Sequence, residues 1–309
     1  MIIKDKIKGA LYGIAVGDAL GAPLEGWGAK SIMDKFGVIK DLQQFDAAWA
    51  LGEFTDDTWL TLATARAYDD DIEFVPEKAG AAMVIWMRAN GKGIGGLTNK
   101  ALANISSGRT DIYNSGKKAL ASSGNRGAGN GSLMRCIATG LVHQSHGLDD
   151  IIRESTILSE ITHSDPRCVA ACVGYNVIVA GLLEDKGFSE LAKYASDIVK
   201  PINEETALVF LGKANGDPHS YDTNDRREMG YVLKALDRAL VALRDGELEQ
   251  QLIQIVNEGG DVDTNAAIAG GLLGAKFGFS AIPQRWIDPL MNKDEIDEAV
   301  EVLNNYRER

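Results

Sequence analysis

The sequence predicts an all-α protein in which many helices pack around one core. Three observations support this fold class. Apolar residues recur through most of the 309-residue chain with the spacing that marks one face of a helix. No run of six residues alternates clearly between apolar and polar, as a half-buried strand would. Only seven prolines, the strongest helix breakers, interrupt the chain.

In the first half of the chain, each predicted helix has a local reason. Residues 4–20 carry apolar side chains at helical spacing, beginning with Ile7 and Leu11. Residues 57–69 follow Thr55 and Asp56, and threonine and aspartate are good N-caps. Apolar periodicity alone predicts the next helices, which cover 74–90, 97–106, 131–145 and 148–162.

The second half continues the same pattern. Residues 166–184 follow Asp165 and begin with Pro166, a favoured arrangement at a helix start. Residues 264–276 are rich in Ala and Gly, which permits close packing against a neighbour, and 294–306 carry a single apolar stripe. Periodicity predicts the other helices, at 188–198, 204–213, 228–243 and 247–257.

Nothing with the composition of a linker divides the chain, so we expect a single domain over residues 1–309. The Gly-rich connections at 91–96 and 124–131 are typical of shaped loops. Residues 214–227 are polar and rich in turn formers, which predicts a surface loop.

Composition and charge exclude several classes of protein. Hydrophobic residues make up 45% and charged residues 25% of the chain, as in soluble globular proteins and unlike disordered ones. The 44 acidic and 32 basic residues give a net charge of −12, and the densest basic pair is Arg226-Arg227. Without a basic patch to neutralise phosphates, neither a nucleic acid nor an anionic membrane is expected as the primary partner.

The N-terminus imitates a signal peptide. Lys4, Lys6 and Lys8 precede an apolar run, but Asp18 and Glu25 interrupt the region where cleavage would occur. No stretch reaches the roughly 18 apolar residues of a transmembrane helix. We therefore expect a cytoplasmic protein, and we expect it to be a monomer.

The three cysteines are too few and too scattered for a disulfide framework, which fits a reducing compartment. Cys168 and Cys172 lie one helical turn apart, and two small buried side chains explain this spacing. The alternative is a metal site that these two residues share with His163, but no further ligand pair accompanies them.

Two acidic clusters, far apart in the sequence, each open a predicted helix. The first acidic cluster is Thr55-Asp56-Asp57 and the second is Asp261-Val262-Asp263-Thr264. Helix capping explains either cluster alone. Together they gather carboxylates at the mouth of a core, where two divalent cations would cancel the repulsion. Hard oxygen ligands without His or Cys favour Mg²⁺, Ca²⁺ or Mn²⁺ over zinc.

A further acidic element lies near the N-terminus. Asp18 stands within an apolar stretch, which predicts either a cap on a neighbouring helix or bonds to backbone amides. Glu25 lies on a Gly/Pro turn, where it could reach a nearby site. An acid on a loop beside bound metals is a candidate general acid or base.

Two other segments are candidates for ligand contact. Residues 124–135 form a Gly-rich loop that runs into a predicted helix, so its backbone N–H groups could bind anionic oxygens, although an ordinary turn is the alternative. His163 lies between two predicted helices. It is either a structural histidine or a ligand contact.

Five motifs occur in one order: GDALGAPLEG, FTDDT, GNGSLMR, THSDP and GGDVDTNAAIAGGLLGA. In this order and spacing they resemble the ADP-ribosylglycohydrolase family, whose bacterial branch includes the dinitrogenase reductase-activating glycohydrolases. The resemblance covers about residues 5–276. It implies an orthogonal all-α bundle with a binuclear Mg²⁺ or Mn²⁺ centre at the mouth of the core.

The resemblance also implies roles for individual residues. The implied metal ligands are Thr55, Asp56, Asp57, Asp261, Asp263 and Thr264. Glu25 corresponds to a group close to the metals that gates the site. Asn130, Gly131 and Ser132 correspond to the loop that holds the diphosphate of ADP-ribose, and His163 to a contact with the distal nucleotide.

The implied activity is hydrolysis of the glycosidic bond between the terminal ribose and a modified side chain. Glu25 and Asp57 are the candidates for proton transfer. An arginine linkage is expected first, with serine-linked ADP-ribose, O-acetyl-ADP-ribose or a small ADP-ribosyl guanidine as alternatives. Two other classes stay open: a non-catalytic or structural relative that binds ADP-ribosylated partners, and another two-metal hydrolase such as a phosphoesterase.

Overall fold

The computed structural model describes residues 2–45, 47–69, 74–124, 127–144, 147–219, 221 and 229–308. Within these ranges the protein is helical and contains no strand. The nearest approach to a sheet is two isolated bridges, between Gly28 and Gly259 and between Gly129 and Tyr231. The predicted all-α class is confirmed.

The first eight helices are α1 (Ile3–Gly21), α2 (Ala29–Phe36), α3 (Asp56–Arg66), α4 (Val75–Ala89), α5 (Gly96–Ser106), α6 (Ile112–Ser122), α7 (Ile137–Val142) and α8 (Leu148–Glu160). The others are α9 (Pro166–Leu183), α10 (Phe188–Val199), α11 (Glu204–Ala214), α12 (Val232–Asp245), α13 (Leu248–Val256), α14 (Val262–Phe277), α15 (Gln284–Ile287) and α16 (Lys293–Arg307). Short 3₁₀ helices occupy Ala22–Leu24 and Phe279–Ala281.

Helices α1 and α14 pack closely against each other in opposite directions and form the centre of the fold. The contact consists of a glycine at every fourth position of α1, which lies against the backbone of α14 (Gly9 on Gly274, Gly13 on Gly270, Gly17 on Ala266, Gly21 on Asp263). A Cβ placed on Gly13 would come within 2.2 Å of the Gly270 carbonyl oxygen. We call this contact the glycine seam. No other residue type allows the two backbones to come so close.

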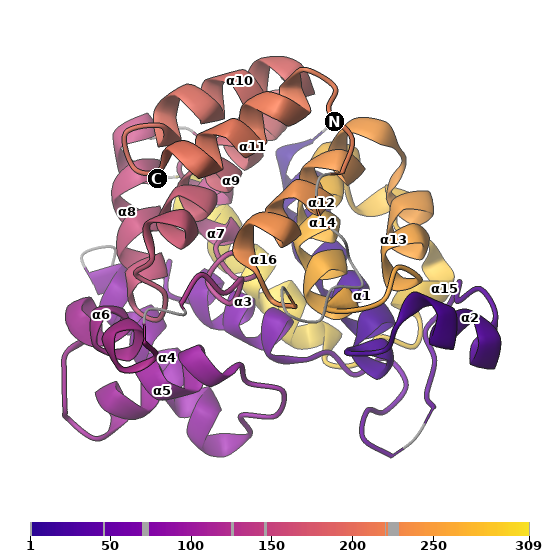
Figure 1. The fold of residues 1–309 in the computed structure, drawn as a ribbon, viewed down its shortest axis with the longest axis horizontal. Helices are drawn as coiled ribbons and strands as arrows, with labels where there is room; N and C mark the ends of the chain where they lie inside the picture. Colours follow the sequence, from indigo (N-terminus) through magenta and orange to yellow (C-terminus); the bar gives the residue numbers. More distant parts are fainter. Residues whose placement is uncertain are drawn as a thin grey trace.

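The other helices surround this pair (Figure 1). Helices α12 and α13 pack on α14, α16 crosses α1 and α3, and α10 with α11 lies over α9 at one end of the molecule. Helices α4, α5 and α6 form a separate lobe beside α3 and α8.

Helix α9 is the one helix in the described ranges that is long and apolar enough to cross a membrane. This is weak evidence for a membrane span, because 89% of the helix is buried in the protein and core helices pass the same test. Cys136, Cys168 and Cys172 are all buried and unbridged, as the interpretation of small core residues predicts.

The structure corrects four element predictions. The helix predicted at 131–145 is wrong in its first part, because residues 131–135 form turns and α7 begins at Ile137. Helices α2, α6 and α15 were not predicted. Helix α2 buries only Ile32, and α15 has four residues, so neither offers enough apolar periodicity to recognise.

Candidate active site

The glycine seam brings the two acidic clusters together. A Cβ on Gly21 would lie 2.3 Å from the Cα of Asp263, so the end of α1 touches the start of α14. The first acidic cluster lies at the start of α3, where Thr55 is the N-cap, and the second lies at the start of α14, where Asp261 is the N-cap. Both helices therefore direct their positive N-terminal ends toward one point, which favours carboxylates there.

Asp18 fixes the position of the first acidic cluster. Its buried carboxylate accepts hydrogen bonds from the backbone N–H groups of Thr55 and Thr58, all at 3.0 Å, and from the Thr58 hydroxyl at 2.6 Å. The prediction that Asp18 caps a neighbouring helix is confirmed, and that helix is α3.

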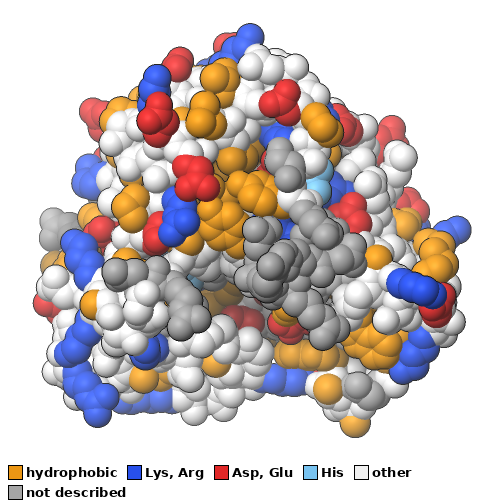
Figure 2. Space-filling view, in the orientation of Figure 1, with side chains coloured by type: hydrophobic (Ala, Val, Ile, Leu, Met, Phe, Trp, Pro, Cys, Tyr) orange, Lys and Arg blue, Asp and Glu red, His pale blue; other side chains and the backbone are white. Residues whose placement is uncertain are grey.

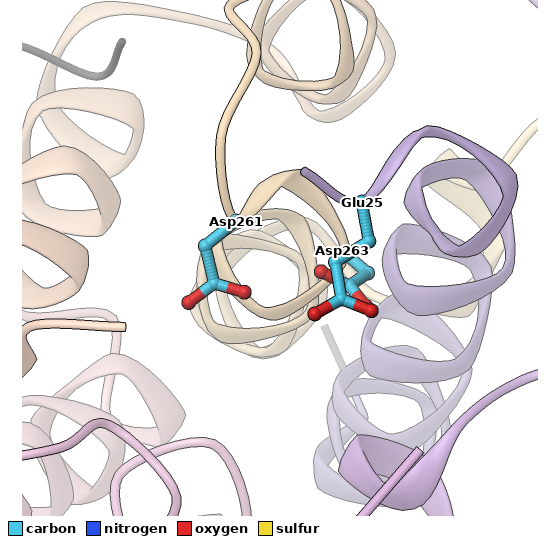
Figure 3. A group of neighbouring side chains, drawn as sticks. All are labelled: Glu25, Asp261 and Asp263. Carbon is cyan, nitrogen blue, oxygen red and sulfur yellow. The ribbon is translucent and has the colours of Figure 1, made fainter. Parts of the chain in front are cut away.

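Glu25, Asp261 and Asp263 form the group of side chains in the described ranges that is close enough to hold a metal ion. Their ligand oxygens all lie within 4.8 Å of one another. Figure 3 shows the carboxylates of Glu25 and Asp263 side by side and that of Asp261 facing them across the start of α14. Glu25, placed on the sequence as a metal-proximal acid, is the exposed member of this group, whereas Asp263 is buried.

Asp57 links the two acidic clusters. Its Oδ2 accepts hydrogen bonds from the Thr55 hydroxyl at 3.0 Å and from the Thr264 hydroxyl at 3.3 Å. Its Oδ1 is buried and has no hydrogen-bond partner, and the same is true of Asp263 Oδ1. Buried carboxylate oxygens without a partner are unfavourable unless a cation or donor approaches them.

Burial and mutual repulsion raise the pKa values of these carboxyl groups. Burial raises the pKa of Asp56 to about 7, with a further contribution from the Asp18 charge. Burial and neighbouring carboxylates raise the pKa values of Asp57 and Asp263 well above the ordinary value. The pKa of Glu25 is also raised, first by partial desolvation of its carboxylate and then by the charge of Asp261. Carboxylates this close together are unfavourable when all of them are ionised, so the cluster binds protons or cations.

The carboxylates form one end of a pocket of about 280 Å³. Its acidic end is lined by Glu25, Asp56, Asp57, Asp261, Asp263 and Thr264. Asn130 and Gly230 line the pocket beside Asp261, and its other end is formed around His163, against which Gly129 and Gly131 lie, with Thr98 next to Gly131. Thr55 is buried behind the acidic end. Figure 2 shows acidic side chains at several places on the surface of the face drawn there, intermixed with basic and hydrophobic ones.

The Gly-rich loop approaches the pocket in a different way from the prediction. It does not run into a helix, and its residues 125 and 126 lie outside the described ranges. The backbone N–H of Asn130 donates to the Gly230 carbonyl at 2.9 Å, and the Asn130 amide donates to Asp261 Oδ2 at 2.7 Å. Asn130 therefore ties the loop to the second acidic cluster, and Gly131 lines the pocket.

Ser132 is placed behind the loop. Its side chain is fully buried, accepts a hydrogen bond from Ser159 Oγ at 3.0 Å and faces Cys172 Sγ. The structure thus brings Asn130, Gly131 and His163 to the pocket lining but turns the Ser132 hydroxyl toward the core.

His163 presents a defined ring nitrogen to the pocket. Arg135 Nη2 donates to Thr162 Oγ1 at 2.9 Å, and Thr162 Oγ1 lies 2.8 Å from His163 Nδ1. When the Thr162 hydroxyl donates to Nδ1, the hydrogen of the neutral ring lies on Nε2. Burial, followed by the charge of Arg135, lowers the pKa of His163 to about 3. The imidazole is therefore neutral, and its Nε2 lies beside Gly129.

Several residues that line the pocket were not predicted from the sequence. Thr98 faces Gly131, since a Cβ on that glycine would lie 3.0 Å from Thr98 Oγ1. The segment that leads into α5 also lines the pocket, through Gly93, Gly95 and the first residue of the helix, Gly96. Its three glycines were the available signal, because glycine-rich turns often border ligands.

Comparisons with known proteins agree with this geometry. The family model of ADP-ribosylglycohydrolase matches residues 1–309. The ADP-ribosyl-[dinitrogen reductase] glycohydrolase of Rhodospirillum rubrum is 27% identical, over 95% of this chain and 92% of its own length. The ADP-ribosylarginine hydrolase Tri1 of Serratia proteamaculans is 29% identical, over 97% of this chain and 79% of its own length.

A solved structure described as an ADP-ribosylglycohydrolase-related protein complex has the same fold. Its TM-score is 0.78 at 25% sequence identity, and the match covers 99% of both chains. The resemblance inferred from the five motifs is confirmed. The chain belongs to the ADP-ribosylglycohydrolase family and is a glycohydrolase that acts on ADP-ribose linkages.

Proposed function

We propose that this protein removes ADP-ribose from modified arginine side chains and that divalent cations bound by the two acidic clusters are required. The observation that carries the proposal is the group formed by Glu25, Asp261 and Asp263, joined to the first acidic cluster through Asp57. The names of the relatives from R. rubrum and S. proteamaculans support ADP-ribosylated protein as the substrate and arginine as the linkage.

The donor set fits hard divalent cations. All the donors are carboxylate or hydroxyl oxygens, which Mg²⁺ and Mn²⁺ prefer. The buried, unpartnered oxygens Asp57 Oδ1 and Asp263 Oδ1 are explained if a cation approaches them. We propose two ions, held by Thr55, Asp56, Asp57, Asp261, Asp263 and Thr264. When bound, they would supply charge neutralisation and Lewis acidity beside the terminal ribose.

Glu25 and Asp57 are the two candidates for proton transfer, and their surroundings differ. Glu25 is the exposed carboxylate at the acidic end, so it can exchange protons with solvent and with the leaving side chain. Asp57 is buried and its Oδ2 already accepts two hydroxyl groups, which suits a ligand better than a proton carrier. We therefore assign proton transfer to Glu25.

Cleavage at C1 of the ribose builds positive, oxocarbenium-like charge on the sugar. The carboxylates around the acidic end stabilise that charge electrostatically. At the other end of the pocket, His163 Nε2–H donates a hydrogen bond to the nucleotide, and the small residues Gly129 and Gly131 leave room for the diphosphate.

The test is release of ADP-ribose from an arginine-ADP-ribosylated protein, with Mg²⁺, with Mn²⁺ and with EDTA. We expect metal-dependent release of intact ADP-ribose. Release of AMP would indicate a phosphoesterase, and activity on a serine-linked substrate alone would overturn the arginine assignment. Cytoplasmic location and the monomeric state stay predictions.

A further inference from the structure

An aromatic side chain lies just outside the acidic end of the pocket. Gly93 lines this end, with a backbone φ of +86°. A Cβ on Gly93 would lie 3.0 Å from Asp56 Oδ1 and 3.5 Å from Trp49 Cη2. The edge of the Trp49 ring and Asp56 Oδ1 therefore border the same space, which the missing side chain of Gly93 leaves open.

The face of Trp49 is covered by a cation from the chain itself. Lys92 Nζ lies 3.9 Å from the centre of the ring and 2.6 Å from Glu53 Oε1. A ring face and a carboxylate together form a site that attracts an organic cation. Neither charged partner is buried, since the side chains of Lys92 and Glu53 are 37% and 24% exposed.

The ring and the carboxylate stand on an anchored turn. Glu53 Oε2 accepts a hydrogen bond from the Ala50 N–H at 2.8 Å, and the Gly52 carbonyl accepts one from the Met291 N–H at 2.9 Å. Lys92, in contrast, reaches the ring through four flexible methylene groups. Trp49 and Glu53 therefore stand on a held turn, whereas the flexible side chain of Lys92 is free to leave them.

The position of this turn matches the chemistry of the substrate. In an ADP-ribose linkage the modified side chain is bonded to C1 of the terminal ribose and the diphosphate to C5, so the two leave opposite ends of the sugar. Gly129 and Gly131, at the other end of the pocket, contact His163 and Thr98, whereas Gly93 contacts Asp56 and Trp49.

We propose that Trp49 and Glu53 form the subsite for the cationic side chain from which ADP-ribose is removed, and that Lys92 occupies this subsite until the substrate displaces it. A planar guanidinium stacks on an indole and pairs with a carboxylate in two hydrogen bonds, which an ammonium group cannot match. The inference rests on the proposed function, because it concerns the leaving side chain of the same reaction.

The probe is agmatine, an alkyl guanidinium without ADP-ribose, and its binding is measured by calorimetry, so the readout does not depend on turnover. We expect Trp49→Leu and Glu53→Gln each to weaken agmatine binding about tenfold, a loss typical of one partly desolvated cation contact. Lys92→Met keeps most of the side chain but removes the competing charge, so it should tighten binding. Lys35→Met is the matched control, because Lys35 lies 4.5 Å over Trp27 on exposed α2.

The same variants are then assayed with an arginine-linked substrate, where the KM should follow the agmatine affinities while kcat changes little. Circular dichroism excludes variants that fail to fold. Equal agmatine affinity in the wild type, Trp49→Leu and Glu53→Gln would overturn the subsite. Weaker binding of agmatine by Lys92→Met would also overturn the subsite, because Lys92 would then have a structural role and hold its own loop against the turn of Trp49 and Glu53. Agmatine binding without any release of ADP-ribose would leave the subsite standing and refute the proposed function.

Discussion

Asp18 and Thr58 are joined by a short, buried hydrogen bond of 2.6 Å from the threonine hydroxyl to the carboxylate Oδ2. The same carboxylate accepts three further contacts from backbone N–H groups at the start of α3. Asp18 lies on α1, so this bond couples the central helix to the turn that presents Asp56 and Asp57.

Asp18→Asn should therefore weaken both the fold and the site. An amide nitrogen would face N–H donors that now meet a carboxylate oxygen, at a loss of about 2 kcal/mol in the free energy of unfolding. Activity should fall as well, because Asp56 and Asp57 lose their support. Urea unfolding and ADP-ribose release measure the two effects. Asp197→Asn, at an exposed position of α10, is the control, and equal stability of the two variants would contradict the role given to Asp18.

A methyl group in the glycine seam should separate α1 from α14. In Gly13→Ala the new Cβ would lie 2.2 Å from a backbone oxygen that cannot move aside, so we expect a loss of about 3 kcal/mol in the free energy of unfolding. In Gly187→Ala the Cβ meets nothing within 4 Å, and the change should stay within about 0.5 kcal/mol. Denaturant unfolding of the two variants compares them directly. Similar stabilities would show that the backbones can separate without loss.

Charge removal from the acidic clusters should have opposite effects on stability and on activity. Asp263 is buried, repelled by Asp261, Glu25 and Asp57, and its Oδ1 has no partner. Asp263→Asn should stabilise the metal-free protein, by about 1 kcal/mol, while ADP-ribose release falls by roughly a hundredfold or more. Melting temperatures in EDTA and with Mg²⁺ test this, because the variant should also lose the metal-induced increase. A variant that melts lower in EDTA than the wild type would refute the repulsion.

Asp56→Ala is expected to abolish activity while the helical fold is largely kept. The side chain lines the acidic end of the pocket and begins α3, whose N-cap and Asp18 contacts come from neighbouring residues. Far-ultraviolet circular dichroism checks the fold and ADP-ribose release checks the activity. Full activity in this variant would remove the first acidic cluster from the proposed metal site.

His163 should make stability depend on pH in the acid range. Its pKa is about 3 in the folded protein and about 6.5 in the unfolded chain, so below pH 6.5 the unfolded chain binds the additional proton. Stability therefore falls as the pH decreases from 6.5 toward 3, and the His163 share between pH 7 and pH 5 is about 2 kcal/mol. Unfolding free energies of the wild type and of His163→Gln at these two pH values measure it. Equal acid sensitivity in the two proteins would contradict a neutral, buried imidazole.

Much of the fold could be predicted because the relevant signals are local. The starts of α3 and α9 depend on a capping side chain, Thr55 or Asp165, that lies within two residues of the amide it serves. The two acidic clusters were likewise visible as helix starts. That Glu25 and Asp263 would meet is a matter of tertiary packing, and here it depended on the family resemblance.

The failures have equally physical causes. Residues 131–135 have helical periodicity, but Asn130 is pulled toward Gly230 and Asp261, and these long-range bonds replace the first turns of a helix. Ser132 has a plausible type and position for a phosphate contact, yet Ser159, on another helix, turns its hydroxyl inward. The Ala- and Gly-rich stretch of α14 predicted close packing, but the sequence did not identify α1 as its partner.

The glycine seam also has a consequence for biosynthesis. The first acidic cluster and Glu25 emerge early from the ribosome, whereas Asp261 and Asp263 emerge more than 200 residues later. Until α14 has been released and has docked along α1, a nascent chain holds three of the five carboxylates at the acidic end, Glu25, Asp56 and Asp57, and lacks the wall of the pocket that α14 supplies. The complete acidic end of the pocket is thus assembled late, because it needs the start of α14 beside the end of α1.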